Sequence, residues 1–110
     1  MGRSLFVTNP VHTASIDTSI TNVPETAWVE VEDSMPFPAN AVEIYNGTGK
    51  ILRIAKGASG SEVAITYLLA PKDTSPILPI EFANGERISI RSLTGEGTAN
   101  LGSVVFNFFG

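Results

Sequence analysis

The sequence contains no cysteine, which excludes disulfide bonds and thiolate metal sites. Charged residues are also scarce. They make up 16% of the 110 residues, whereas soluble domains usually carry about a quarter. The net charge is −4 and Lys and Arg form no cluster, so we expect no nucleic-acid partner. A surface with so few charges indicates cover by another protein, the alternative being a surface of Ser, Thr and Asn.

Long apolar runs are missing as well. No run approaches the roughly 20 residues of a membrane helix, and the opening residues, MGRSLFVTNP, lack the apolar core of a signal peptide. We therefore expect neither a membrane partner nor export.

The residues that are present alternate between apolar and polar types. Alternation with period two predicts strands with one buried face. Three such runs lie between 41 and 69, separated by Asn46–Gly49 and Gly57–Gly60. Because Gly and Asn accept the positive φ of tight turns, we expect a three-stranded antiparallel meander. Its last strand would bury one face, made of Val63, Ile65, Tyr67 and Leu69.

Similar patterns predict further strands over 11–20, 26–32, 77–82, 87–93 and 103–109. Pro79 limits the strand over 77–82 to an edge or a bulge, since proline has no amide hydrogen. The last strand is apolar on both faces, which suits a central position. Together these patterns predict a single-domain, all-β fold: an antiparallel, jelly-roll-like sandwich of about eight strands. A seven-stranded immunoglobulin-like sandwich is the alternative. We expect an N-terminal arm over 1–12 and the sandwich over 13–110.

Groups with catalytic potential are few and scattered. The single histidine, His12, has no evident partners for a catalytic triad. No Ser lies in a G-x-S-x-G elbow. The carboxylates of Glu30, Glu32 and Asp33 fit a solvated strand face. We therefore predict no enzymatic activity, no cofactor and no metal site.

Three arginines are placed to share one exposed sheet face. Arg53, Arg87 and Arg91 lie at outward positions of their predicted strands. We expect them to pair with carboxylates, either within the sheet or across an interface. The candidate partners are Glu43, Glu62 and Glu81.

Apolar residues outside the predicted strands are candidates for partner contacts. Leu5, Phe6 and Val7 form either an edge strand or a docking arm, and Phe37, between two prolines, either closes the core or contacts a partner. The Gly-rich loop over 94–102 is a further candidate. The predicted partner-binding residues are therefore Leu5, Phe6, Val7, Phe37, Thr94, Glu96 and Asn100.

The runs VEIYNGTGKILRIAKGASGSEVAITYLLAP, LPIEFANGERISIRSL and VVFNFFG resemble small head decoration (cement) proteins of tailed bacteriophages. The resemblance covers residues 41–110. It implies a non-enzymatic virion protein that is synthesised in the host cytoplasm and binds the major capsid protein on the capsid exterior. It also implies a homo-oligomer at a capsid symmetry axis. The alternatives are a tail or fibre component, or a carbohydrate-binding sandwich that uses Trp28, Tyr45 and Tyr67.

Overall fold

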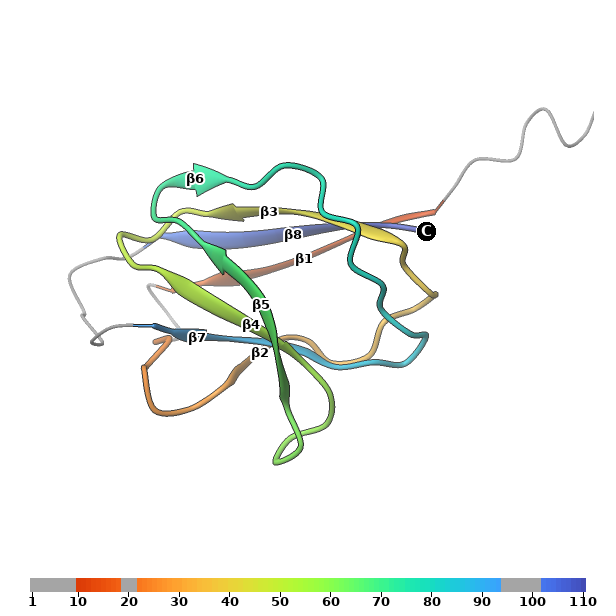
Figure 1. Ribbon diagram of the computed structural model, residues 1–110, viewed down its shortest axis with the longest axis horizontal. Helices are drawn as coiled ribbons and strands as arrows, with labels where there is room; N and C mark the ends of the chain where they lie inside the picture. The colour runs from red at the N-terminus through yellow and green to blue at the C-terminus, as the bar shows by residue number, and fades with distance from the viewer. Residues whose placement is uncertain (1–9, 19–21, 94–101) are drawn as a thin grey trace, which may run out of the picture.

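The computed structural model describes residues 10–18, 22–93 and 102–110. These residues form eight strands in two antiparallel sheets of four, packed face to face (Figure 1). The predicted all-β sandwich is therefore confirmed. Among the described residues there is no helix of the length and apolarity that crossing a bilayer requires. The strands are β1 (Val11–Asp17), β2 (Val29–Glu32), β3 (Ala41–Asn46), β4 (Leu52–Lys56), β5 (Val63–Leu69), β6 (Asp73–Thr74), β7 (Ile88–Ser92) and β8 (Ser103–Phe109).

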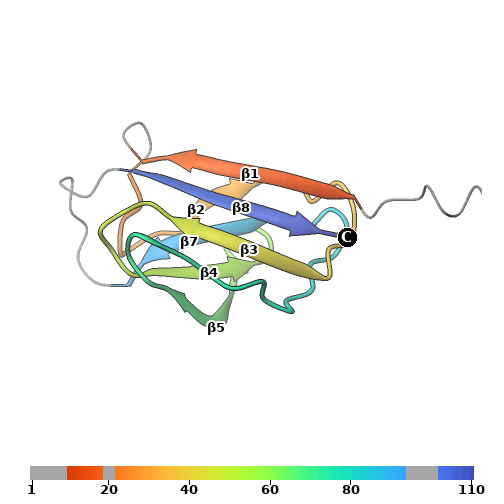
Figure 2. The same ribbon diagram turned by 90° about the horizontal axis from the view of Figure 1, so that it is seen from above.

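The strand order is that of a jelly roll. One sheet has the order β1-β8-β3-β6, which we call sheet A, and the other has the order β2-β7-β4-β5, which we call sheet B. The first strand therefore pairs with the last, the second with the seventh, the third with the sixth and the fourth with the fifth. This is the order of one long hairpin folded double around a core, as a jelly roll requires. Figure 2 shows β8 between β1 and β3.

The core between the sheets contains the inward residues that alternation predicted. On β8, Val104, Phe106 and Phe108 are fully buried. The pairing of β8 with both β1 and β3 confirms its predicted central position. Phe108 contacts two other phenyl rings: it stacks on Phe106 with a centroid distance of 5.7 Å and meets Phe82 edge-on at 5.2 Å. Burial of several large rings makes β8 the main apolar contribution of sheet A. The other large, fully buried side chains are Met35, Val42, Ile44, Leu52, Ile54, Leu69, Ile88 and Ile90.

The predicted three-stranded meander is wrong, because β3 and β4 belong to different sheets. The connection is organised by the buried side chain of Asn46. Its amide nitrogen donates hydrogen bonds to the carbonyls of Lys50 (2.6 Å) and Ala70 (3.1 Å), and its amide oxygen accepts one from the Thr48 backbone nitrogen (3.0 Å). A Cβ at Gly47 would lie 2.5 Å from the Ser103 carbonyl oxygen. Asn-Gly therefore forms a crossover packed against the start of β8, and only the β4–β5 hairpin occurs as predicted.

The predicted strand over 77–82 is also wrong. That segment makes isolated bridges, Leu78 with Val42 and Phe82 with Ala39, along the β3 edge. Pro79, between these two contacts, cannot donate to a ladder, so no continuous pairing forms. The two-residue β6 lies instead within 70–76, where the sequence patterns predicted no strand.

Candidate functional site

The two sides of the sandwich, where the sheets have their outermost strands, differ in how they are closed. On one side, β1 and β2 are joined by a side-chain hydrogen bond between His12 Nε2 and Glu32 Oε1. The His12 ring also stacks on Phe108 at 6.1 Å and meets Phe37 edge-on at 6.4 Å. This side, which we call the closed side, is therefore held by hydrogen bonding and ring packing together.

The opposite side ends in β5, the outermost strand of sheet B (Figure 2). Its seven residues, VAITYLL, carry no charge. Val63 is 67% exposed and Leu68 is 44% exposed. The outward edge of β5 pairs with no strand of the described chain, so its backbone N–H and C=O groups are available to a partner. We call this strand and its outward edge the β5 edge.

Pairing between β5 and β4 is interrupted in the middle. Arg53 faces Leu68 and Ala55 faces Ala64, so Ile54 alone stands opposite three residues of β5. A bulge of this kind bends and twists the strand. The β4–β5 hairpin projects from the body of the sandwich (Figure 1). The prediction that Val63 would be buried is therefore wrong: it lies on the projecting part, whereas Leu69 at the other end is buried.

The other outermost strands have features that prevent pairing with a further strand. β2 has four residues and contains Glu30 and Glu32, and β6 has only two residues. β1 follows Pro10, ends at Asp17 and is tied to β2 through His12. Short length, charge and proline are the usual protections of sheet edges. Among the strands that the structure describes, β5 is the long, uncharged edge.

The outer face of sheet B carries the three arginines, and one of them is neutralised. Arg87 forms ion pairs with Glu30 through Nε and with Glu62 through one terminal nitrogen, each at 3.1 Å. The pairing with Glu62 confirms one predicted partner, and Glu30 is an additional one. Hydrogen bonds from the backbone N–H groups of Glu62 itself and of Gly60, together with Arg87, lower the pKa of the Glu62 carboxyl below its ordinary value.

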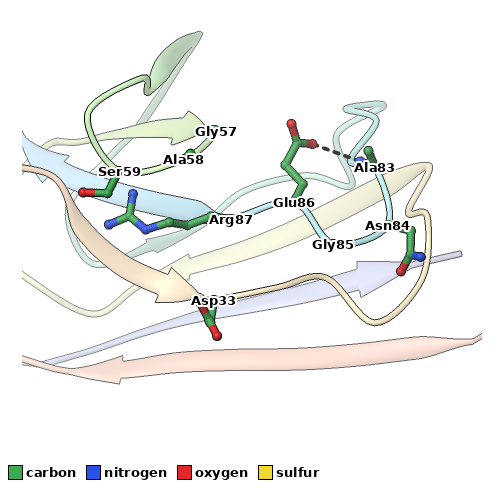
Figure 3. A pocket seen from close by; sticks show the side chains of 9 residues that line it. All are labelled: Asp33, Gly57, Ala58, Ser59, Ala83, Asn84, Gly85, Glu86 and Arg87. Carbon is green, nitrogen blue, oxygen red and sulfur yellow. Dashed lines mark hydrogen bonds between the residues drawn. The ribbon is translucent and has the colours of Figure 1, made fainter.

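A hollow of about 490 Å³ lies beside Arg87, between the β4–β5 turn and the turn that precedes β7 (Figure 3). Its polar side chains do not converge on one point. The Arg87 side chain extends toward Ser59, and Glu86 accepts a hydrogen bond from the Ala83 backbone nitrogen at 2.9 Å. Because Arg87 is already held by two carboxylates, the hollow offers no assembled acid, base or nucleophile among the side chains that line it. In the described ranges, no group of three His, Asp or Glu is placed to hold a metal ion.

Only one of the predicted partner-binding residues lies in the described part of the chain. Phe37 is half-buried and packs against the core and His12. Of the predicted arm, residues 11 and 12 belong to β1. The remaining predicted contacts lie outside the described residues: Leu5, Phe6, Val7, Thr94, Glu96 and Asn100.

The three aromatic residues considered for carbohydrate binding do not share one surface. Tyr45 is exposed on β3 of sheet A, whereas Tyr67 is half-buried and packs against the core. Trp28 immediately precedes β2 and is covered by the Arg91 guanidinium, 4.6 Å from the ring centre. A sugar groove would need these rings side by side, so their positions disfavour that alternative.

Sequence reasoning missed the β5 edge as a site. The signal was present as the lack of charge or proline between 63 and 69, but it was interpreted only as a buried strand. Comparison with known proteins gives no match: no family model, no curated protein and no solved structure matches this chain. The surfaces of the protein itself are therefore the evidence for its function.

Proposed function

We propose that the protein is a non-enzymatic virion component that decorates and cements the exterior of a bacteriophage capsid by binding the major capsid protein. It acts as a homo-oligomer at a capsid symmetry axis after synthesis in the host cytoplasm. The observation that carries the proposal is the β5 edge, which is uncharged, exposed and open to pairing. The jelly roll, a common architecture of viral capsid domains, supports the same class by analogy.

The β5 edge supplies two kinds of contact to a second copy of the chain. Its free backbone groups extend sheet B by strand pairing, and Val63 and Leu68 bury apolar surface. Burial of apolar area stabilises by about 25 cal/mol per Å². The entropic costs of association and ordering oppose this gain, so a single copy binds the capsid weakly. An oligomer makes several contacts at once and therefore binds tightly. Repetition of such contacts over the shell then resists internal pressure.

The direct test is density-gradient sedimentation of particles of the phage that encodes this sequence, with mass spectrometry of each fraction. We expect the chain to travel with intact heads at a copy number comparable to that of the capsid subunits. A few copies per particle would instead assign it to the tail or a fibre. Recovery only at the top of the gradient would contradict a virion role, and glycan binding would then be tested.

A further inference from the structure

A row of side chains crosses the outer face of sheet B in the order Trp28, Arg91, Arg53, Leu68. Arg91 lies over the Trp28 ring, Arg53 is the cross-strand neighbour of Arg91, and Leu68 is the cross-strand neighbour of Arg53. We call these four residues the arginine row. Its last member belongs to β5, so the row runs directly to the β5 edge.

The arginine row places two cations of like charge directly opposite each other. Like charges directly opposite each other destabilise a sheet, because the Cβ atoms of such a pair lie only about 5 Å apart. Arg87, on the same face, has two carboxylates beside it. Within the described residues, neither Arg53 nor Arg91 has a carboxylate partner, and Nε of Arg91 is buried without a hydrogen bond. The free protein therefore maintains an arrangement that would be stabilised by anionic groups from outside.

Two small residues beside the arginine row are covered by neighbouring side chains on the outer face of sheet B. Ser89 and Ala55 are cross-strand neighbours that point outward by alternation, yet both are fully buried. Ala55 does not belong to the core cluster between the sheets, and Arg87 reaches across the sheet from Glu30 to Glu62. Arg87 thus lies along the sheet, and Arg91 is held on the Trp28 ring, so the row stands beside side chains with fixed positions.

We propose that the arginine row binds carboxylates on an acidic segment of the major capsid protein. The identity of this partner depends on the proposed function, whereas the chemistry of recognition does not. Each guanidinium presents a planar fork of donors that suits a carboxylate in two-point contact. Trp28 fixes the position of Arg91, and Leu68 supplies an apolar margin at the β5 edge.

The charge around the row favours separate carboxylates over an extended polyanion. The protein carries a net charge of −4. A nucleic acid that reached both arginines would extend past them over a protein of net negative charge, which disfavours binding of a long polyanion. An acidic protein segment brings only the charges that the two arginines neutralise.

Arg53→Gln is the variant that tests the row, because no hydrogen bond or ion pair to the described chain is lost with it. Arg87→Gln is the control, since it removes the same charge from the same face at a residue that is already neutralised. Binding of each purified protein is measured on heads of a phage whose copy of this gene is deleted. We expect Arg53→Gln to weaken binding at least about tenfold, as loss of a charge-assisted contact implies. Arg87→Gln should change the affinity about twofold or less once the folded fraction is taken into account.

A second measurement separates failure of the inference from failure of the proposed function. The side-chain Nε–H resonances of the arginines are followed by NMR during titration with the peptide acetyl-Glu-Thr-Glu-amide, with the Gln-Thr-Gln peptide as control. Saturable shifts of Arg53 and Arg91 with the acidic peptide alone would support the row as a carboxylate site, even if wild-type protein did not bind heads. No shift, or a response to a DNA oligonucleotide in its place, would overturn the inference. So would equal binding of wild type and Arg53→Gln to heads, although the proposed function would survive that result.

Discussion

The closed side of the sandwich and the β5 edge differ in how their outermost strands are protected. On the closed side, β1 and β2 are joined by His12 and Glu32, and the rings of Phe37 and Phe108 fill the space beside them. At the β5 edge, a long uncharged strand projects with apolar residues in solvent. The difference indicates that exposure at β5 is not a general property of this small sandwich. The protein protects one margin and leaves the other available.

The largest effect on the closed side is expected when the buried Phe108 ring is removed. Phe108→Ala deletes a fully buried side chain that contacts Phe82, Phe106 and His12. The variant should lose about 3–5 kcal/mol of unfolding free energy, as large-to-small core substitutions do. Urea denaturation followed by Trp28 fluorescence measures this loss. The control is Phe109→Ala at the neighbouring half-buried position, and an equal loss there would contradict the assigned packing.

The His12–Glu32 hydrogen bond of the closed side is expected to contribute less. His12→Ala removes the link to Glu32 and the contact with Phe37, so unfolding free energy should fall by about 1–2 kcal/mol. The same urea titration measures it, with the exposed β1 position Ser15→Ala as control. Equal stability of the two variants would show that the closed side does not depend on this pair.

The strands that fill the core were predictable because alternation alone determines their inward faces. Ile88, Ile90, Val104, Phe106 and Phe108 are buried as period two requires. The crossover at Asn46 was not predictable, since Asn-Gly has the same local signature in a hairpin and in a crossover. The crossover is specified by groups distant in sequence, namely the Ala70 carbonyl and Ser103, which lies close to Gly47. Local sequence does not contain that information.

The candidate site was predictable only in part. Outward positions of Arg53, Arg87 and Arg91 follow from alternation, and Glu62 was named among the partners of the arginines. The neutralisation of Arg87 but not of Arg53 depends on strand register, which places Arg53 opposite Arg91. Exposure of Val63 depends on the bulge opposite Ile54. Register and bulges are set by pairing across the sheet, so residue patterns along one strand do not specify them.

A smaller effect distinguishes the two kinds of arginine on sheet B. Arg87→Gln should lower the unfolding free energy by roughly 1 kcal/mol, because two carboxylates lose their partner. Arg53→Gln should leave it unchanged or raise it by up to about 0.5 kcal/mol, because a like-charge pair disappears. Thermal unfolding of both variants at low salt measures the difference. Destabilisation by Arg53→Gln equal to that of Arg87→Gln would contradict the absence of an internal partner.

The smallest expected effect is the acid response of Glu62. Because its pKa is lowered in the folded protein, the ionised carboxyl stabilises the fold above its ordinary pKa of 4.5, and this contribution is lost as pH falls through the folded value. Glu62→Gln should therefore be less stable than wild type near neutral pH and approach wild-type stability in acid. Unfolding titrations across this pH range measure the gap, and a gap independent of pH would contradict the role given to this carboxyl.

The most direct test of the central claim, that the β5 edge joins copies of this chain, is sedimentation velocity of two matched variants. Val63→Lys charges the β5 edge, and Val11→Lys places the same charge at a residue of β1 that is 60% exposed. Wild type and Val11→Lys should associate with similar concentration dependence, whereas Val63→Lys should remain monomeric at concentrations at least about tenfold higher, because lysine on an edge strand blocks strand addition. Monomeric wild-type protein at all concentrations, or equal association of the two variants, would contradict the account.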